Sequence, residues 1–67
     1  GCTDEDGARR ALRDAGLTPV SIGGYAVWSC GKDDTFATKF TATNAQGQTV
    51  TGAVCSDWLK GKTVRFD

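Results

Sequence analysis

The sequence predicts a single small α+β domain over residues 1–67, in which an N-terminal helix packs on an antiparallel β-meander of three to four strands. Three observations predict this class. Apolar residues recur at helical spacing in the first part of the chain and alternate with polar residues in the rest. Turn residues separate the alternating stretches at short intervals. The chain has 67 residues, of which 39% are apolar, and this is enough for one small core.

Residues 3–16 are predicted to form the helix. Thr3 or Asp4 is expected to cap its start, and the acidic residues of the first turn suit the positive end of the helix dipole. One narrow apolar stripe has the i, i+3, i+4, i+7 spacing and consists of Ala8, Ala11, Leu12 and Ala15. Gly16 and Pro19 end the helix. Because the stripe is made of small residues, we expect the helix to lie close to the sheet.

Four segments that follow are rich in β-forming residues and are predicted as strands: residues 20–30, 35–43, 48–55 and 63–66. Gly23 and Gly24 interrupt the first strand, which indicates a bulge or bend. A hairpin turn is expected at residues 44–47, with Gly47 at positive φ.

The alternation also assigns the two faces of the sheet. The core face is predicted to carry Phe36, Thr38, Phe40 and Ala42, with Val50 and Val54 from the next strand. The other face is predicted to carry Ala37, Lys39, Thr41 and Thr43, with Thr49 and Thr51 opposite them. We expect this second face to be flat and polar.

The three cysteines predict one disulfide and one further thiol. Cys30 and Cys55 end the first and third strands, which a meander brings to the same end of the sheet, so we expect them to pair. The second strand lies between them, and the link must therefore close around its start near Thr35. Closing this loop would stabilise the fold by roughly 3 to 4 kcal/mol on the chain-entropy model. In the alternative, both thiols are reduced and buried in a cytosolic protein.

Cys2 lies at the very start of the chain. A cysteine at a mature N-terminus is where a bacterial lipoprotein carries its lipid, so Cys2 is a candidate for lipidation and for membrane attachment. In the alternative, the start of the chain is an arbitrary boundary, and Gly1 remains from processing. No apolar stretch approaches the ~18 residues that a membrane span needs.

The residue types argue against catalysis and against cofactors. The chain has no His, which removes the commonest general base and metal ligand. It has no C-x-x-C pair and no glycine-rich phosphate-binding pattern. The formal net charge of zero lacks the basic excess of nucleic-acid-binding proteins. We therefore expect no enzyme activity, cofactor, metal or nucleic-acid partner. A small enzyme that uses Asp33, Asp34 or Asp57 is the least favoured alternative.

Aromatic residues beside cations are the candidates for binding a partner. Trp58 is followed by Lys60, Lys62 and Arg65 around a turn, a combination typical of protein-binding hot spots. In the alternative, Trp58 covers the end of the core. Trp28 is a further candidate if it lies on the face of the sheet that the helix leaves open.

The chain resembles a family of small uncharacterised bacterial and prophage-encoded proteins. The resemblance is carried by Gly24-Tyr25, by residues 30–36, by Val54-Cys55 and by residues 58–66. Members of that family often follow a signal peptide or a lipoprotein signal, so the resemblance implies an extracytoplasmic location and no catalytic residue. The layout of residues 8–22 is similar to that of PepSY-like periplasmic domains.

We therefore expect a small monomeric extracytoplasmic module, periplasmic or extracellular, that binds another protein and is lipid-anchored if Cys2 is modified. The alternative from a different class is an intracellular phage-type inhibitor or regulator of a host protein, with reduced cysteines. The sequence identifies neither the partner nor the process.

Overall fold

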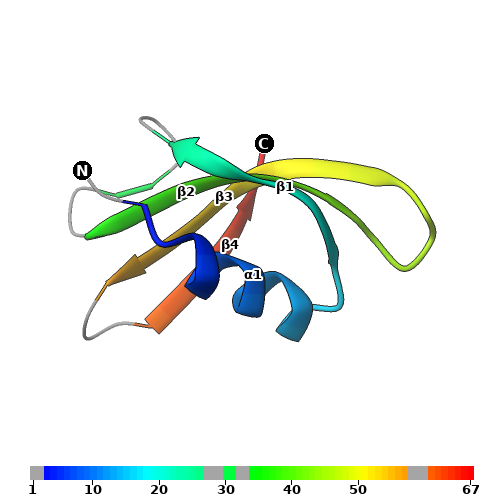
Figure 1. The fold of residues 1–67 in the computed structure, drawn as a ribbon, viewed down its shortest axis with the longest axis horizontal. Helices are drawn as coiled ribbons and strands as arrows, with labels where there is room; N and C mark the ends of the chain where they lie inside the picture. The colour runs from blue at the N-terminus through cyan, green and yellow to red at the C-terminus, as the bar shows by residue number, and fades with distance from the viewer. Residues whose placement is uncertain (1–2, 27–29, 32–33, 58–60) are drawn as a thin grey trace.

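Helix α1 lies across one face of a four-stranded antiparallel sheet (Figure 1). The computed structural model describes residues 3–26, 30–31, 34–57 and 61–67. The elements are α1 (Glu5–Asp14), β1 (Thr18–Tyr25), β2 (Phe36–Thr43), β3 (Thr49–Asp57) and β4 (Gly61–Phe66). The strands neighbour one another in chain order, β1-β2-β3-β4, which is a meander. The predicted fold class is confirmed, with the helix shorter than the predicted range at both ends.

The start of α1 is fastened to the sheet by Asp4, which caps the helix. Its carboxylate accepts a hydrogen bond from the Gly7 backbone N–H over 3.1 Å. Its own backbone N–H donates to Oγ1 of the buried Thr38 on β2, over 2.9 Å. The cap therefore also satisfies a hydroxyl that is buried in the sheet. No helix in the described part of the chain is long and apolar enough to cross a membrane.

The core between helix and sheet is built from few large side chains. Its buried members are Ala8, Leu12, Leu17, Phe40, Ala42 and Val54. The rings of Phe40 and Phe66 meet edge to face with their centroids 6.1 Å apart, although β3 runs between their strands. Gly52 of β3 is the register partner of both residues. Because Gly52 has no side chain, the two rings can meet above it.

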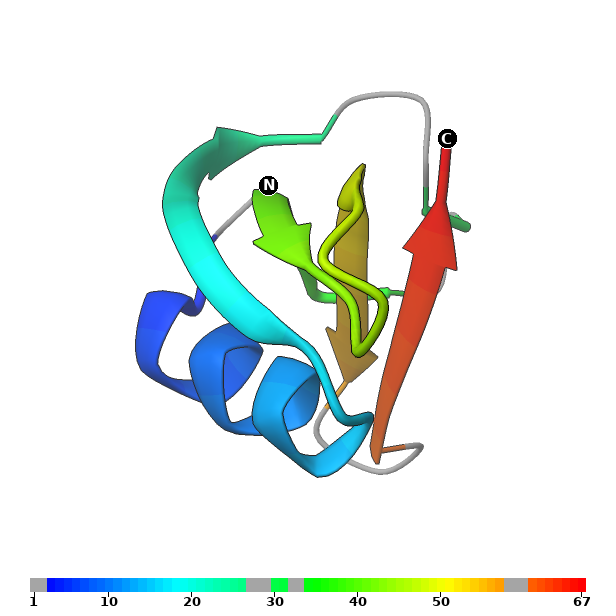
Figure 2. The same ribbon diagram turned by 90° about the vertical axis from the view of Figure 1, so that its right-hand side faces the viewer.

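Strand β1 is bent, as its two adjacent glycines predict. The pairing of β1 with β2 shifts register between Ile22 and Tyr25. Gly23 and Gly24 both have positive φ, at 154° and 83°, which favours glycine at these positions. Figure 2 shows β1 curving over the helix. The strand ends at Tyr25, several residues before the predicted end.

The face of the sheet away from the helix is only half open, which corrects the expectation of a wholly polar surface. Ala26, Ala37, Ala53 and Cys55 are buried against one another on this face, and Cys30 packs against them. The Ala26 N–H donates to the Ala37 carbonyl oxygen over 3.1 Å. Ala26 therefore extends the pairing of β1 with β2, and Cys30 lies against this end of the face. Alternation alone could not show this, because alanine fits both a covered and an exposed position.

The other half of this face carries the predicted threonines. Thr41 pairs with Thr51, and Thr43 pairs with Thr49, as the hairpin register requires. Lys39 and Arg65 lie beside them, as register partners of Ala53 from its two sides. We call this surface the open half-face; it consists of Lys39, Thr41, Thr43, Thr49, Thr51 and Arg65.

Candidate functional site

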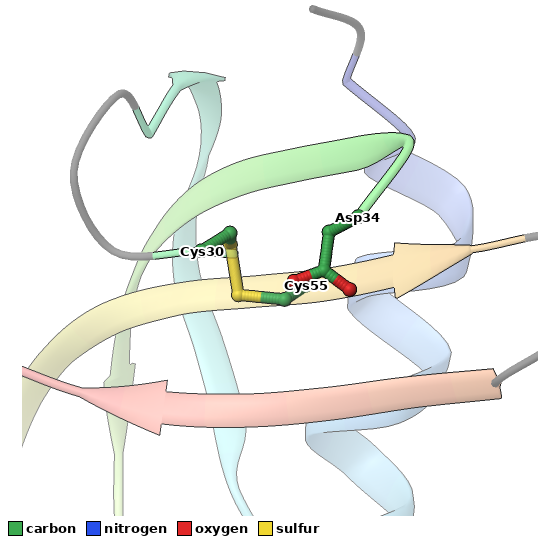
Figure 3. A group of neighbouring side chains, drawn as sticks. All are labelled: Cys30, Asp34 and Cys55. Atoms are coloured by element: carbon green, nitrogen blue, oxygen red, sulfur yellow. A yellow bond between two sulfur atoms is a disulfide. The ribbon is translucent and has the colours of Figure 1, made fainter. Parts of the chain in front are cut away.

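A disulfide joins Cys30 to Cys55, with their Cα atoms 5.6 Å apart, which confirms the predicted pair (Figure 3). Cys55 is buried in the middle of the sheet, where its register partner on β2 is Ala37. Cys30 is half-buried and packs on the same face as Ala37. The bond therefore lies on the face of the sheet that Ala37 shares, and it does not have to pass around the start of β2.

Asp34 is held beside this disulfide by a tight turn. Its backbone N–H donates to the Gly31 carbonyl oxygen over 3.2 Å, and its Oδ2 accepts from the Gly31 N–H over 2.9 Å. Figure 3 shows the carboxylate close to the two sulfurs. One carboxylate oxygen of Asp34 and the Sγ atoms of Cys30 and Cys55 all lie within 4.8 Å of one another.

The residue after Asp34 ties the turn to the end of β3. The hydroxyl of Thr35 donates to Oδ1 of Asp57 over 2.7 Å. The segment that approaches the sheet is thus fastened by a covalent bond at Cys30 and by a hydrogen bond at Thr35. These two links hold the segment against one end of the face, and the open half-face is the part beyond it.

The open half-face borders a shallow hollow of about 390 Å³. Its lining is mostly polar and comprises Ser21, Gly23, Lys39, Phe40, Thr41, Thr51, Gly52 and Asp67. Thr51 donates from Oγ1 to Oδ2 of Asp67 over 2.9 Å. The side chains here therefore offer hydroxyl groups, the Lys39 ammonium and a carboxylate that is already hydrogen-bonded. These groups suit hydrogen bonding and ion pairing.

The structure separates the two described members of the predicted binding segment. Arg65 pairs with the buried Ala53 and lies on the open half-face. Lys62 lies on the helix side, where its stem is so close that a Cβ on Gly7 would be 2.8 Å from its Cε. Trp28, Trp58 and Lys60, like the lipidation candidate Cys2, lie outside the described residues. Lys62 and Arg65 therefore cannot meet one flat partner surface together.

Lys62 contributes to a different groove, between α1 and β4. The groove has a volume of about 590 Å³ and is lined by Arg10, Ala11, Asp14, Ala15, Lys62, Thr63 and Val64. Its lining mixes both signs of charge with small apolar side chains. This mixture gives no preference for one class of ligand.

The sequence did not single out Lys39, Thr41 or Thr51 as site residues, and it named Asp34 only as an acid that the least favoured alternative, a small enzyme, would use. A signal for the first three was present, because strict alternation on either side of a short hairpin turn places them on one face. Asp34 follows Cys30 by four residues and lies beside the cysteine pair because its turn with Gly31 holds it there.

Comparisons with protein-family models, with curated proteins and with solved structures find no match to this chain.

Proposed function

We propose that this protein is a small extracytoplasmic module that binds an acidic segment of a partner protein on its open half-face. The observation that carries the proposal is the placement of Lys39 and Arg65 on either side of Ala53, on a surface otherwise made of threonine. Both side chains are exposed, whereas Ala53 between them is fully buried. The two cations therefore lie on either side of the edge of the buried cluster, next to the threonines of the open half-face.

The disulfide supports the extracytoplasmic location. Disulfides persist in oxidising compartments and are rare in the cytosol, where thiols are kept reduced. The Cys30–Cys55 bond also lies where it fastens a covering segment to the sheet. This is the use expected in a small domain whose core is too limited to hold such a segment by apolar contacts alone.

The charges of the open half-face favour an acidic partner. Adjacent strands lie about 4.8 Å apart, so Lys39 and Arg65, two strands apart, have backbones separated by roughly 10 Å. Two carboxylates of an extended acidic segment can span such a separation. The one carboxylate of the neighbouring hollow, on Asp67, is hydrogen-bonded by Thr51. Arginine at such a position is among the residues enriched in binding hot spots.

The test compares two double variants of equal charge change. Lys39→Ala with Arg65→Ala removes the cations of the open half-face, and Arg9→Ala with Arg13→Ala removes two exposed cations from the helix. Each protein is immobilised and exposed to an extracytoplasmic extract of the source cells. A retained protein is identified by mass spectrometry, purified and titrated against all three proteins at low and high salt.

We expect the open half-face variant to bind the partner at least about 10-fold more weakly than the wild type, a loss of about 1.4 kcal/mol. The helix variant should keep wild-type affinity, and salt should weaken wild-type binding because the contacts are exposed. Far-UV circular dichroism shows whether each variant is folded. Equal affinities for the open half-face variant and the wild type would contradict the proposal.

A further inference from the structure

We propose that the reduced protein binds one zinc-like divalent cation between Cys30, Cys55 and Asp34, so that this corner of the fold holds either a disulfide or a metal ion. The proposal is independent of the partner-binding surface. It rests on three ligand groups that lie close together, Cys30 and Asp34 from one turn and Cys55 from β3 (Figure 3). Two thiolates with a carboxylate are a ligand set that Zn²⁺ accepts.

The spacing of these groups fits a tetrahedral ion. Zinc lies about 2.3 Å from sulfur and 2.0 to 2.2 Å from oxygen, so ligand atoms around it are separated by roughly 3.5 to 3.8 Å. The Sγ atoms and the Asp34 oxygen already lie within 4.8 Å of one another. After reduction, the two sulfurs must move apart and Asp34 must approach, and rotations of the side chains can achieve this.

The Asp34 carboxylate is oriented in the way that metal-binding carboxylates are. One oxygen, Oδ2, is fixed by the Gly31 N–H. Among the described residues, no hydrogen bond is made to the other oxygen, Oδ1, which leaves it for an ion. Hydrogen bonds of this kind hold a ligand in place before the metal arrives and contribute to affinity.

The disulfide and the metal exclude each other by chemistry. Reduction by a thiol or phosphine reductant transfers two electrons, breaks the S–S bond and adds two protons, which gives two thiols. Metal binding then releases both protons as the thiolates coordinate the ion. Three protein ligands leave the fourth position of a tetrahedral ion to water. In the oxidised protein neither sulfur is a thiolate, so the site cannot form.

The test uses the full chain with Cys2→Ser, so that only the two relevant thiols remain. The reduced protein is titrated with Co²⁺, whose thiolate charge-transfer absorption reports sulfur ligation, and Zn²⁺ is then added in competition. We expect one ion per chain in the reduced protein and no such absorption in the oxidised protein. Asp34→Asn should weaken binding at least about 10-fold. Asp14→Asn, an exposed change on α1, should leave it unchanged.

Reduction alone can unfold so small a domain, and the experiment includes this outcome. If the reduced chain is unfolded, Zn²⁺ should restore its circular dichroism, since ions that bind only the folded state stabilise it. Asp34→Asn should then need at least about 10-fold more Zn²⁺ for the same recovery. Absent charge-transfer bands, identical titrations for wild type and Asp34→Asn, or binding without recovery of the fold would each overturn the proposal.

Discussion

Replacing both Cys30 and Cys55 by alanine is expected to lower the free energy of unfolding by about 3 to 4 kcal/mol, the cost of reopening a loop of this length in the unfolded chain. The two cysteines are 25 residues apart in the sequence. Native proteins have a free energy of unfolding of roughly 5 to 15 kcal/mol, so this loss is a large part of the total stability. Urea titration followed by circular dichroism measures it.

The matched control for this experiment is Cys2→Ser, which removes a thiol but leaves the pair intact. Its midpoint of unfolding should equal that of the wild type. The double variant should also show faster proteolysis in residues 26–35, because the covalent fastening of this segment is gone. A double variant as stable as the wild type would show that the bond adds nothing to the fold.

Gly52→Ala is expected to destabilise the protein by about 3 kcal/mol, in the upper range for overpacking. A Cβ at this position would collide with the Arg65 carbonyl oxygen and would lie 2.9 Å from the Phe66 Cα. These are backbone atoms of the neighbouring strand, so no side-chain rotation relieves the contact. Strand β4 must move away from β3, and the contact between the rings of Phe40 and Phe66 is lost with it.

Thr49→Ala is the matched control for Gly52→Ala. Thr49 is exposed on the same strand, and its replacement should change stability by no more than about 0.5 kcal/mol. Thermal unfolding of the two variants, together with the near-ultraviolet signal of the aromatic rings, separates the outcomes. Wild-type stability for Gly52→Ala would mean that β4 does not pack against β3 as closely as the structure shows.

Much of the fold follows from local patterns. The alternation in β2 and the turn that ends at Gly47 define the central hairpin, and the observed pairing of Thr41 with Thr51 agrees with both. The paired glycines gave the bulge in β1 at its observed place. These features depend on residues close together in the sequence, whose conformations are fixed by sterics and by hydrogen bonding within a few positions.

The path of the chain over the sheet could not be predicted in the same way. Ala37 and Ala53 are buried in a cluster with Ala26 and Cys55 against which Cys30 packs, and nothing in their own strands requires a cover. The approach of Asp34 to Cys55 on β3 depends on this packing and on the turn that holds Asp34 beside Cys30. Such contacts join distant parts of the chain, so no spacing motif exists that reports them.

Two of the predicted binding residues lie on the same strand but on opposite faces of the sheet. Lys62 and Arg65 are three positions apart on β4, and side chains an odd number apart point to opposite faces of a sheet. Applying this rule to the predicted fourth strand separates the two residues from the sequence alone. Lys39 was harder to place beside Arg65, because this requires the register of β2 with β3 and of β3 with β4.

The most direct test of a disulfide-fastened extracytoplasmic module is to alkylate the free thiols of the protein as it is isolated from its own compartment, then map the peptides by mass spectrometry. We predict that the Cys30 and Cys55 peptides are unmodified and linked before reduction and become alkylated only after it. If both cysteines are alkylated at the outset, the protein holds reduced thiols where it functions. That result would contradict the extracytoplasmic assignment and favour an intracellular regulator.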